Sequence, residues 1–237
     1  MKNALIKFLL KAIVLGLACA FVIKFAAPQI LRAYIQIGIG DCSKIPILCL
    51  APQEPPVLLA IDKNYAQELI PLEFPKTRIS APKGFKVVQE LVKKPYYKKK
   101  RPRNAEAVIY ILHQPAGFFI NLFPQVKQVG IKDNYEFMRS LMCARQTEIN
   151  NLKDAFFVIL KSIFTPDLGD QRTAKMIRFK SEERNYFINY NLSGPVNFFD
   201  CSIITESGDF FKVYIKDTGK VLDLNKAFTI ASGISPA

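Results

Sequence analysis

The sequence predicts an α+β fold, in which an antiparallel sheet and its packed helices form a sandwich, preceded by a single N-terminal membrane helix. Three observations predict this class. Apolar and polar residues alternate with a period of two in several late segments, and apolar residues recur every three or four positions in others. An unbroken apolar stretch, residues 12–23, also lies near the N-terminus between Lys11 and Lys24.

The apolar stretch 12–23 is too short to cross a membrane by itself. Its twelve residues rise about 18 Å as a helix, whereas the hydrocarbon core is about 30 Å thick. A spanning helix needs residues 8–31, with the flanking lysines raising their ammonium groups toward the headgroups. Two alternatives stay open, a signal peptide cleaved at Ala18-Cys19-Ala20 and a lipoprotein acylated at Cys19. The apolar residues that follow Ala20 favour the uncleaved signal anchor.

The charges around the apolar stretch indicate its orientation. Four positive groups precede the stretch (Lys2, Lys7, Lys11 and the terminal amine) and three follow it (Lys24, Arg32 and Lys44), so the positive-inside rule favours a cytoplasmic N-terminus by a small margin. We therefore expect the rest of the chain to lie outside the cytoplasm, in the periplasm or the extracellular space.

The cysteines agree with this placement. Cys42 and Cys49 come just beyond the expected membrane segment, and their spacing can close a small disulfide loop in an oxidising compartment. Two unpaired thiols are the alternative. Cys143 and Cys201 offer a second candidate bridge, for which the sequence supplies no Cα distance.

Composition divides the chain into three parts. Residues 1–40 form the transmembrane anchor or signal segment, and residues 41–75 form a proline-rich tether that is fairly stiff. Within the tether, residues 62–69 predict two turns of helix. Residues 76–237 have the length of one ordinary domain with its own core.

The first part of this domain predicts short strands. Residues 77–81 and 85–92 are β-prone runs separated by a turn at Pro82-Lys83-Gly84. Residues 107–112 form a compact apolar strand. We expect these strands to make antiparallel ribbons, with the intervening basic run as a loop.

Helices are expected in the middle and at the end of the domain. Asp133 with Glu136 three positions later has the pattern of a capping box, followed by an apolar helix face. The spacing in residues 149–163 favours a second helix, although a buried strand at 156–160 stays open. A last helix begins at Asp223.

Three late strands are the clearest elements. Apolar residues alternate with polar ones in 186–192, 199–203 and 211–215, and turns at 193–195 and 206–209 join them. Aromatic doublets such as Phe198-Phe199 and Phe210-Phe211 place one ring on each face of a strand, which favours helices on both faces of the sheet.

This element order, with the Pro-Lys-Gly-Phe turn at Pro82 to Phe85, resembles the layout of the PsbP/Mog1-like superfamily. The resemblance covers about 150 residues. It implies a binding or assembly factor without catalysis, and it assigns no functional residue.

The net charge of +13 is concentrated in two segments. Five positive charges lie in residues 1–34 and seven in residues 93–103, which leaves 21 basic against 20 acidic residues. The folded part is therefore nearly neutral, and a nucleic-acid-coating protein is not expected. The basic run is the candidate site for an anionic lipid, glycan or protein partner, with these residues: Lys93, Lys94, Tyr96, Tyr97, Lys98, Lys99, Lys100, Arg101 and Arg103. A solvated loop is the alternative.

The sequence offers no catalytic constellation. His113 is the single histidine and directly follows a strand, so no triad is expected. Asp167 and Asp170 lie in a loop whose residues are those of any turn, and we expect neither a metal nor a cofactor. Residues 115–124 are the best candidate for an exposed aromatic patch.

Two functions follow from these observations. The first is a membrane-anchored extracytoplasmic binding or assembly domain with no evident catalytic site. The alternative is an envelope hydrolase that uses carboxylates paired in space, which requires a deep cleft with two convergent acids.

Overall fold

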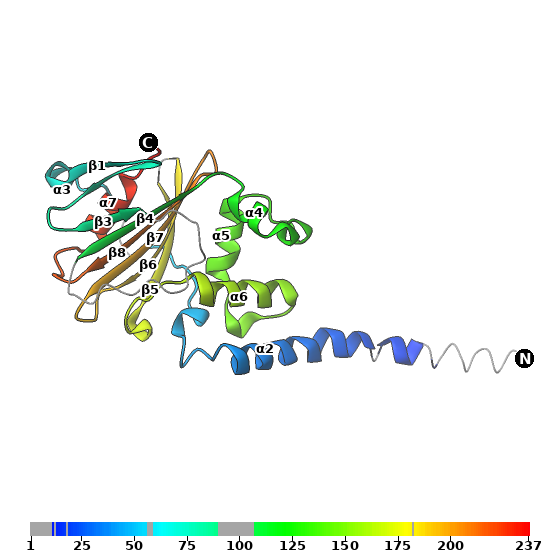
Figure 1. Ribbon diagram of the computed structural model, residues 1–237. Helices are drawn as coiled ribbons and strands as arrows, with labels where there is room; N and C mark the ends of the chain where they lie inside the picture. The colour runs from blue at the N-terminus through cyan, green and yellow to red at the C-terminus, as the bar shows by residue number, and fades with distance from the viewer. Residues whose placement is uncertain (1–10, 12, 18, 56–58, 90–106, 182) are drawn as a thin grey trace, which may run out of the picture. The chain divides into compact units, whose positions relative to one another are not determined.

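The computed structural model describes residues 11, 13–17, 19–55, 59–89, 107–181 and 183–237. They form a mixed fold of helices and two sheets, divided into two compact units (Figure 1). The first unit comprises Met1–Cys49 with Ala144–Phe164, and the second comprises Leu50–Cys143 with Thr165–Ala237.

The first unit is helical. Its elements are η1 (Val22–Ala26), α2 (Ala27–Gly38), η2 (Pro46–Cys49), η4 (Gln146–Glu148) and α6 (Leu152–Phe164). A helix over Ile13–Gly38 is long and apolar enough to cross a membrane. The helix expected at 149–163 is confirmed, and the Asn151 side chain caps it by accepting from the Asp154 backbone N–H at 3.0 Å.

The second unit holds both sheets. Its elements are α3 (Lys63–Glu68), β1 (Ile70–Phe74), β2 (Thr77–Ala81), β3 (Lys86–Gln89), β4 (Val108–Gln114), α4 (Phe118–Leu122), η3 (Pro124–Val129), α5 (Asn134–Cys143), η5 (Gln171–Thr173), β5 (Lys175–Ser181), β6 (Arg184–Asn191), β7 (Asn197–Thr205), β8 (Phe210–Asp217) and α7 (Leu224–Ser232). The range 41–75, predicted to be a tether, contains η2, α3 and β1.

The strands are antiparallel with one exception. The larger sheet has the order β3-β4-β8-β7-β6-β5, and a separate pair joins β1 to β2. The three predicted late strands are β6, β7 and β8, paired in sequence. The expected antiparallel ribbon at the other edge is wrong, because β3 and β4 are parallel. Residues 90–107 separate the two strands in the sequence, and a parallel pair needs a connection of about a dozen residues or more.

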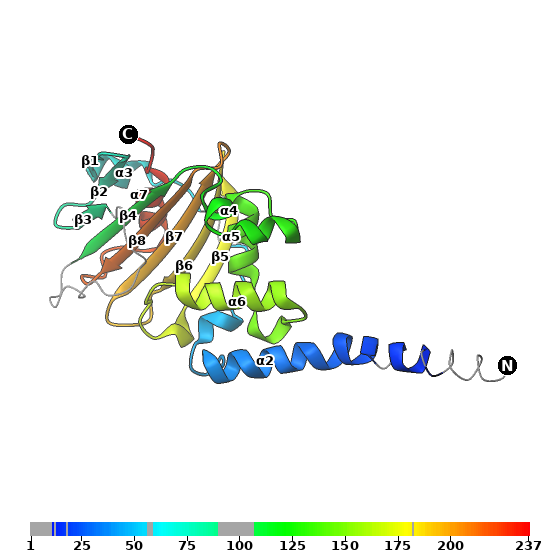
Figure 2. The ribbon, with the colours of Figure 1, turned by 45° about the vertical axis from the view of Figure 1, so that its right-hand side comes forward.

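Helices α7 and α5 pack on opposite faces of this sheet. The Phe228 ring of α7 meets Tyr186 edge-on at 5.2 Å, whereas Tyr135 of α5 lies 6.2 Å from the neighbouring Phe187. Since adjacent strand residues point to opposite faces, the two helices cover different sides (Figure 2). Both faces therefore bury aromatic rings.

The α5 face of the sheet is also partly polar. Asn189, Asp200, Ser202 and Lys212 project on this side, and all four are buried. The polar face of an ordinary antiparallel sheet is solvated, whereas this one is buried. Its burial is a feature that only the tertiary structure reveals.

Helix caps agree with the sequence signals. Asp133 accepts a hydrogen bond from the Glu136 N–H at 2.7 Å, and Asp223 accepts from the Lys226 N–H at 2.8 Å. Glu136 in turn accepts from the Lys132 N–H at 2.7 Å, one residue before the position of an ideal capping box. These contacts satisfy N–H groups that a helix leaves without partners in its first turn.

Candidate functional site

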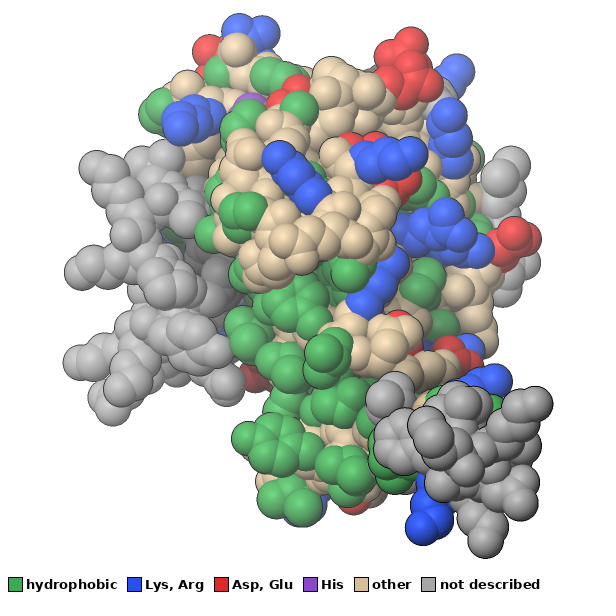
Figure 3. Space-filling model, turned by 90° about the vertical axis from the view of Figure 1, so that its right-hand side faces the viewer, with side chains coloured by type: hydrophobic (Ala, Val, Ile, Leu, Met, Phe, Trp, Pro, Cys, Tyr) green, Lys and Arg blue, Asp and Glu red, His purple; other side chains and the backbone are tan. Residues whose placement is uncertain are grey.

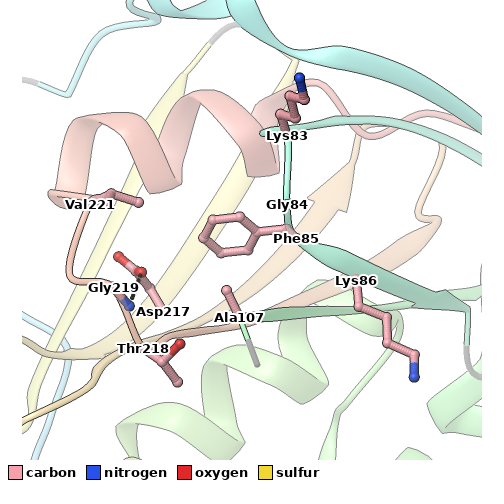
Figure 4. Close-up of a pocket in the computed structure, with 9 residues that line it drawn as sticks. All are labelled: Lys83, Gly84, Phe85, Lys86, Ala107, Asp217, Thr218, Gly219 and Val221. Atoms are coloured by element: carbon pink, nitrogen blue, oxygen red, sulfur yellow. Dashed lines mark hydrogen bonds between the residues drawn. The ribbon is translucent and has the colours of Figure 1, made fainter. Parts of the chain in front are cut away.

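A cavity of about 690 Å³ opens on the second unit where β3 begins and β8 ends (Figure 4). Three segments form it: the turn before β3, the residue before β4 and the turn after β8. The lining residues are Lys83, Gly84, Phe85, Lys86, Ala107, Asp217, Thr218, Gly219 and Val221.

The turn before β3 places Phe85 in the cavity. Gly84 has a φ of +88°, a left-handed conformation that glycine adopts without strain, and the Phe85 N–H donates to the Pro82 carbonyl at 3.3 Å. Directly afterwards, the Lys86 N–H donates to the Ala107 carbonyl at 3.0 Å and starts the pairing with β4. The Phe85 ring consequently points toward the turn after β8 (Figure 4).

The turn after β8 is organised by Asp217. One carboxylate oxygen accepts the Gly219 N–H at 3.1 Å, and the other accepts the Leu222 N–H at 2.7 Å. Asp217 is buried, and Lys220 adopts a left-handed φ of +53° within the turn. The carboxylate therefore holds the wall of the cavity through backbone donors. The sequence Asp-Thr-Gly-Lys at 217–220 is typical of a turn, and from it the turn that forms this wall could have been predicted.

The cavity has an apolar wall, a buried carboxylate at Asp217 and two lysines at its edge. Phe85, Ala107 and Val221 supply the apolar surface, and Val221 is 57% exposed. The exposed side chains of Lys83 and Lys86 extend away from the cavity on either side of Phe85 (Figure 4). This arrangement suits a ligand that has an apolar part and a negative group beside it.

The basic run predicted to bind an anionic partner lies outside the described residues, with all nine of its candidates: Lys93, Lys94, Tyr96, Tyr97, Lys98, Lys99, Lys100, Arg101 and Arg103. The chain is described again from Ala107, which lines the cavity. The sequence pattern predicts the run but not the cavity, because the segments that line the cavity are far apart in the chain.

Two of the three cysteines of the first unit are joined, and the third, Cys19, is a free and exposed thiol. Cys42 and Cys49 form a disulfide with a Cα–Cα distance of 5.8 Å, and η2 ends at the second of them. The Asp41 carboxylate starts this loop by accepting from the Ser43 hydroxyl and from the Ser43 and Lys44 N–H groups, which lowers the pKa of Asp41. In the second unit Cys143 and Cys201 are free thiols.

Residues 115–124 form α4 and the start of η3, fixed by a buried asparagine. Asn134 accepts the Phe119 N–H at 3.1 Å and donates to the carbonyls of Pro115 and Gly208 at 3.0 and 2.9 Å. The expected exposed aromatic patch is wrong, because Phe119 is buried and Phe118 and Phe123 are half-buried, and among the large apolar residues of this segment Leu122 is the exposed one, at 51%. Figure 3 shows hydrophobic side chains gathered in the lower part of the face that it draws.

The remaining polar candidates have structural partners. His113 stacks on Phe211 with ring centroids 4.6 Å apart, and its Nε2 lies 3.5 Å from Asp209 Oδ1. Asp170 pairs with Arg172 at 2.7 Å, and this contact lowers the pKa of Asp170 to about 2. Among the described residues no group of three or more histidine, cysteine, aspartate or glutamate side chains is placed to hold a metal ion.

Neither a protein-family model, nor a curated protein, nor a solved structure matches this chain. The fold and the cavity define its class as a mixed α/β protein with an N-terminal helix long and apolar enough to cross a membrane.

Proposed function

We propose that this chain is a membrane-anchored, extracytoplasmic binding or assembly domain, an α+β sandwich held at the membrane by one helix. The observation that carries the proposal is the helix Ile13–Gly38, which has 26 residues and is only 7% buried over its most apolar window. Exposing this apolar surface to water costs about 25 cal/mol of free energy per Å². In a bilayer the same surface contacts acyl chains instead of water, so this cost is not incurred.

The side of the membrane is argued from charge and redox chemistry. Lysines precede the apolar helix, which favours a cytoplasmic N-terminus. The disulfide between Cys42 and Cys49 supports an oxidising compartment for the chain beyond the helix. Protease digestion of sealed cells tests this topology: the second unit is degraded from outside if the proposal holds, and is protected if the orientation is reversed.

The partner we propose is anionic. Lys83 and Lys86 flank the apolar cavity, and the seven positive charges of residues 93–103 lie in the segment that joins β3 to β4. Each lysine or arginine near an anionic surface contributes about 1 kcal/mol. Lipid headgroups, acidic glycans and acidic proteins share the required chemistry. The resemblance to the PsbP/Mog1-like superfamily supports a binding or assembly role as a fold analogy only.

The test measures capture of anionic vesicles by full-length protein reconstituted in phosphatidylcholine nanodiscs. Replacing Lys98, Lys99, Lys100 and Arg101 with glutamine is expected to weaken capture of phosphatidylglycerol vesicles, since four charges leave the run. Capture by the unaltered protein should also fall with added salt.

A matched control removes four positive charges elsewhere. Lys63, Lys76, Lys127 and Lys132 are exposed in the second unit, and their replacement by glutamine makes the same change in net charge. This control should retain capture. Equal losses in both variants would show that net charge alone attracts the vesicles, and an unchanged run variant would remove the basic run from the site.

The hydrolase alternative gains no support from the cavity. Asp217 is the single acid among its lining residues, and both of its oxygens accept backbone N–H groups. Carboxylate hydrolysis needs two convergent acids, so we propose binding rather than hydrolysis.

A further inference from the structure

In the first unit the end of the apolar helix lies beside α6 (Figures 1 and 2). The buried side of α2 carries Pro28 and Ile35, which are two turns apart on one helix face. The large apolar side chains described before Pro28 are exposed. Packing against protein therefore begins near Pro28, on one face of the helix only, since Ile30, Tyr34 and Ile37 on its other faces stay exposed.

Arg32 fixes which part of α6 lies beside this helix. Its Nε donates to the Ile149 carbonyl at 3.0 Å, and its Nη2 donates to Asn150 Oδ1 at 3.5 Å. The residues directly before α6 are thus held at the level of Arg32. From there α6 extends toward η2, against which it packs.

Polar side chains surround this level. Arg145 donates to Glu148 through Nε at 2.8 Å, and the Asn150 N–H donates to Asp154 at 2.9 Å. We call Arg32 and residues 145–154 the polar collar. Within it Leu152, the first residue of α6, is 75% exposed.

Helix length places the polar collar relative to a bilayer. The rise from Ile13 to Arg32 is about 29 Å at 1.5 Å per residue, close to the hydrocarbon thickness of about 30 Å. We propose that the polar collar rests on phospholipid headgroups and that Leu152 inserts at the acyl boundary, as a second membrane contact beside the helix. This inference rests on the membrane anchor proposed above.

The chemistry of the polar collar fits the headgroup layer. It contains both signs of charge and two asparagines, which match zwitterionic headgroups, and one leucine for the apolar boundary. Lys24 lies about two turns deeper in the helix than Arg32, and its side chain can raise the ammonium only part of the way toward this layer. Its ammonium lies 5.7 Å from the centre of the Phe25 ring.

The absence of tryptophan from the chain provides the test, because each introduced tryptophan is then the only one. We would compare the full-length variants Leu152→Trp, Phe25→Trp and Ile163→Trp in nanodiscs of phosphatidylcholine and of its brominated form. All three positions are exposed, at 75%, 54% and 43%, so a larger ring has room. Circular dichroism checks that each variant folds.

The bromine atoms are on the acyl chains and quench only a tryptophan that lies among them. Quenching therefore reports whether each introduced tryptophan has entered the acyl region. We expect quenching and a blue-shifted emission for Phe25→Trp and Leu152→Trp. Ile163→Trp should be neither quenched nor shifted, because position 163 is about 16 Å further along α6.

The other outcomes separate the two claims. Quenching at position 25 without quenching at 152 overturns the polar collar contact and leaves the anchor intact. Equal quenching at 152 and 163 also overturns it, because α6 would then lie along the surface. An absence of quenching at position 25 shows that the proposed membrane anchor is wrong. The polar collar contact, which rests on the anchor, is then wrong as well.

Discussion

Lys212 Nζ lies 3.1 Å from Asp200 Oδ1 inside the second unit, on neighbouring strands β8 and β7. The Asp200 side chain is fully buried and that of Lys212 is 10% exposed, so this is an interior ion pair. Asn189 of β6 donates to the other Asp200 oxygen at 3.2 Å. Three central strands are thus joined by polar side chains on the face where α5 packs.

Removing one partner of this ion pair should be far more harmful than removing both. Asp200→Ala leaves a buried ammonium without its counter-ion, and we expect a loss of about 3–5 kcal/mol in the free energy of unfolding. The double variant Asp200→Leu with Lys212→Met should lose much less, because no unpaired charge remains. Urea unfolding of the full chain in detergent micelles measures both.

A surface pair provides the control for that prediction. Lys180 lies 3.7 Å from Glu206, with both side chains more than half exposed. Lys180→Met should cost at most about 1 kcal/mol. Similar losses for Asp200→Ala and Lys180→Met would contradict the interior role of the Asp200–Lys212 pair.

Asn134 should be the residue on which the placement of α4 depends. Asn134→Ala removes three hydrogen bonds that tie Phe119, Pro115 and Gly208 together, and we expect a loss of about 2–4 kcal/mol. Thermal unfolding followed by circular dichroism measures it. Asn225→Ala, at an exposed position of α7, should change stability by no more than about 0.5 kcal/mol. Comparable losses in the two variants would refute the bridging role.

Asp170 should titrate with a pKa of about 2, mainly because the Arg172 side chain donates to it. A lowered pKa favours the ionised form in the folded state, so this contribution to stability is present above about pH 4 and is lost as pH falls toward 2. Arg172→Ala should raise the pKa toward its usual 3.8, although the backbone N–H of residue 172 still donates. Carboxyl ¹³C chemical shifts measure the midpoint, and an unchanged midpoint would show that Arg172 is not the cause.

Three of the five cysteines should react with iodoacetamide in unfolded, unreduced protein. Mass spectrometry is expected to find the remaining two joined as Cys42–Cys49. Chain-entropy arguments give a small loop of this kind about 2.5 kcal/mol of stabilisation. Cys42→Ser should therefore make the first unit more sensitive to limited proteolysis in detergent, whereas Cys143→Ser serves as the control. Five reactive thiols would exclude the bridge.

The elements that follow local patterns were largely predictable from the sequence. The period-two alternation located β6, β7 and β8, and Asp223 located the start of α7. Strand β5 was missed, since Lys175–Ser181 was not recognised as an alternating run. The candidate site was harder to predict from the sequence. The turn at Pro82–Phe85 was predicted, but nothing in the sequence indicated that Ala107 and Asp217 lie beside it.

By itself the sequence determined the apolar N-terminal helix, the concentration of positive charge and most of the local elements. These properties depend on residues a few positions apart, because side chains repeat along a helix or a strand with a fixed period. Only the tertiary structure decided that β3 and β4 are parallel, that Asp200 and Lys212 are buried, and that Phe85 shares a cavity with Asp217. Each of these depends on contacts between different segments of the chain, which no local pattern encodes.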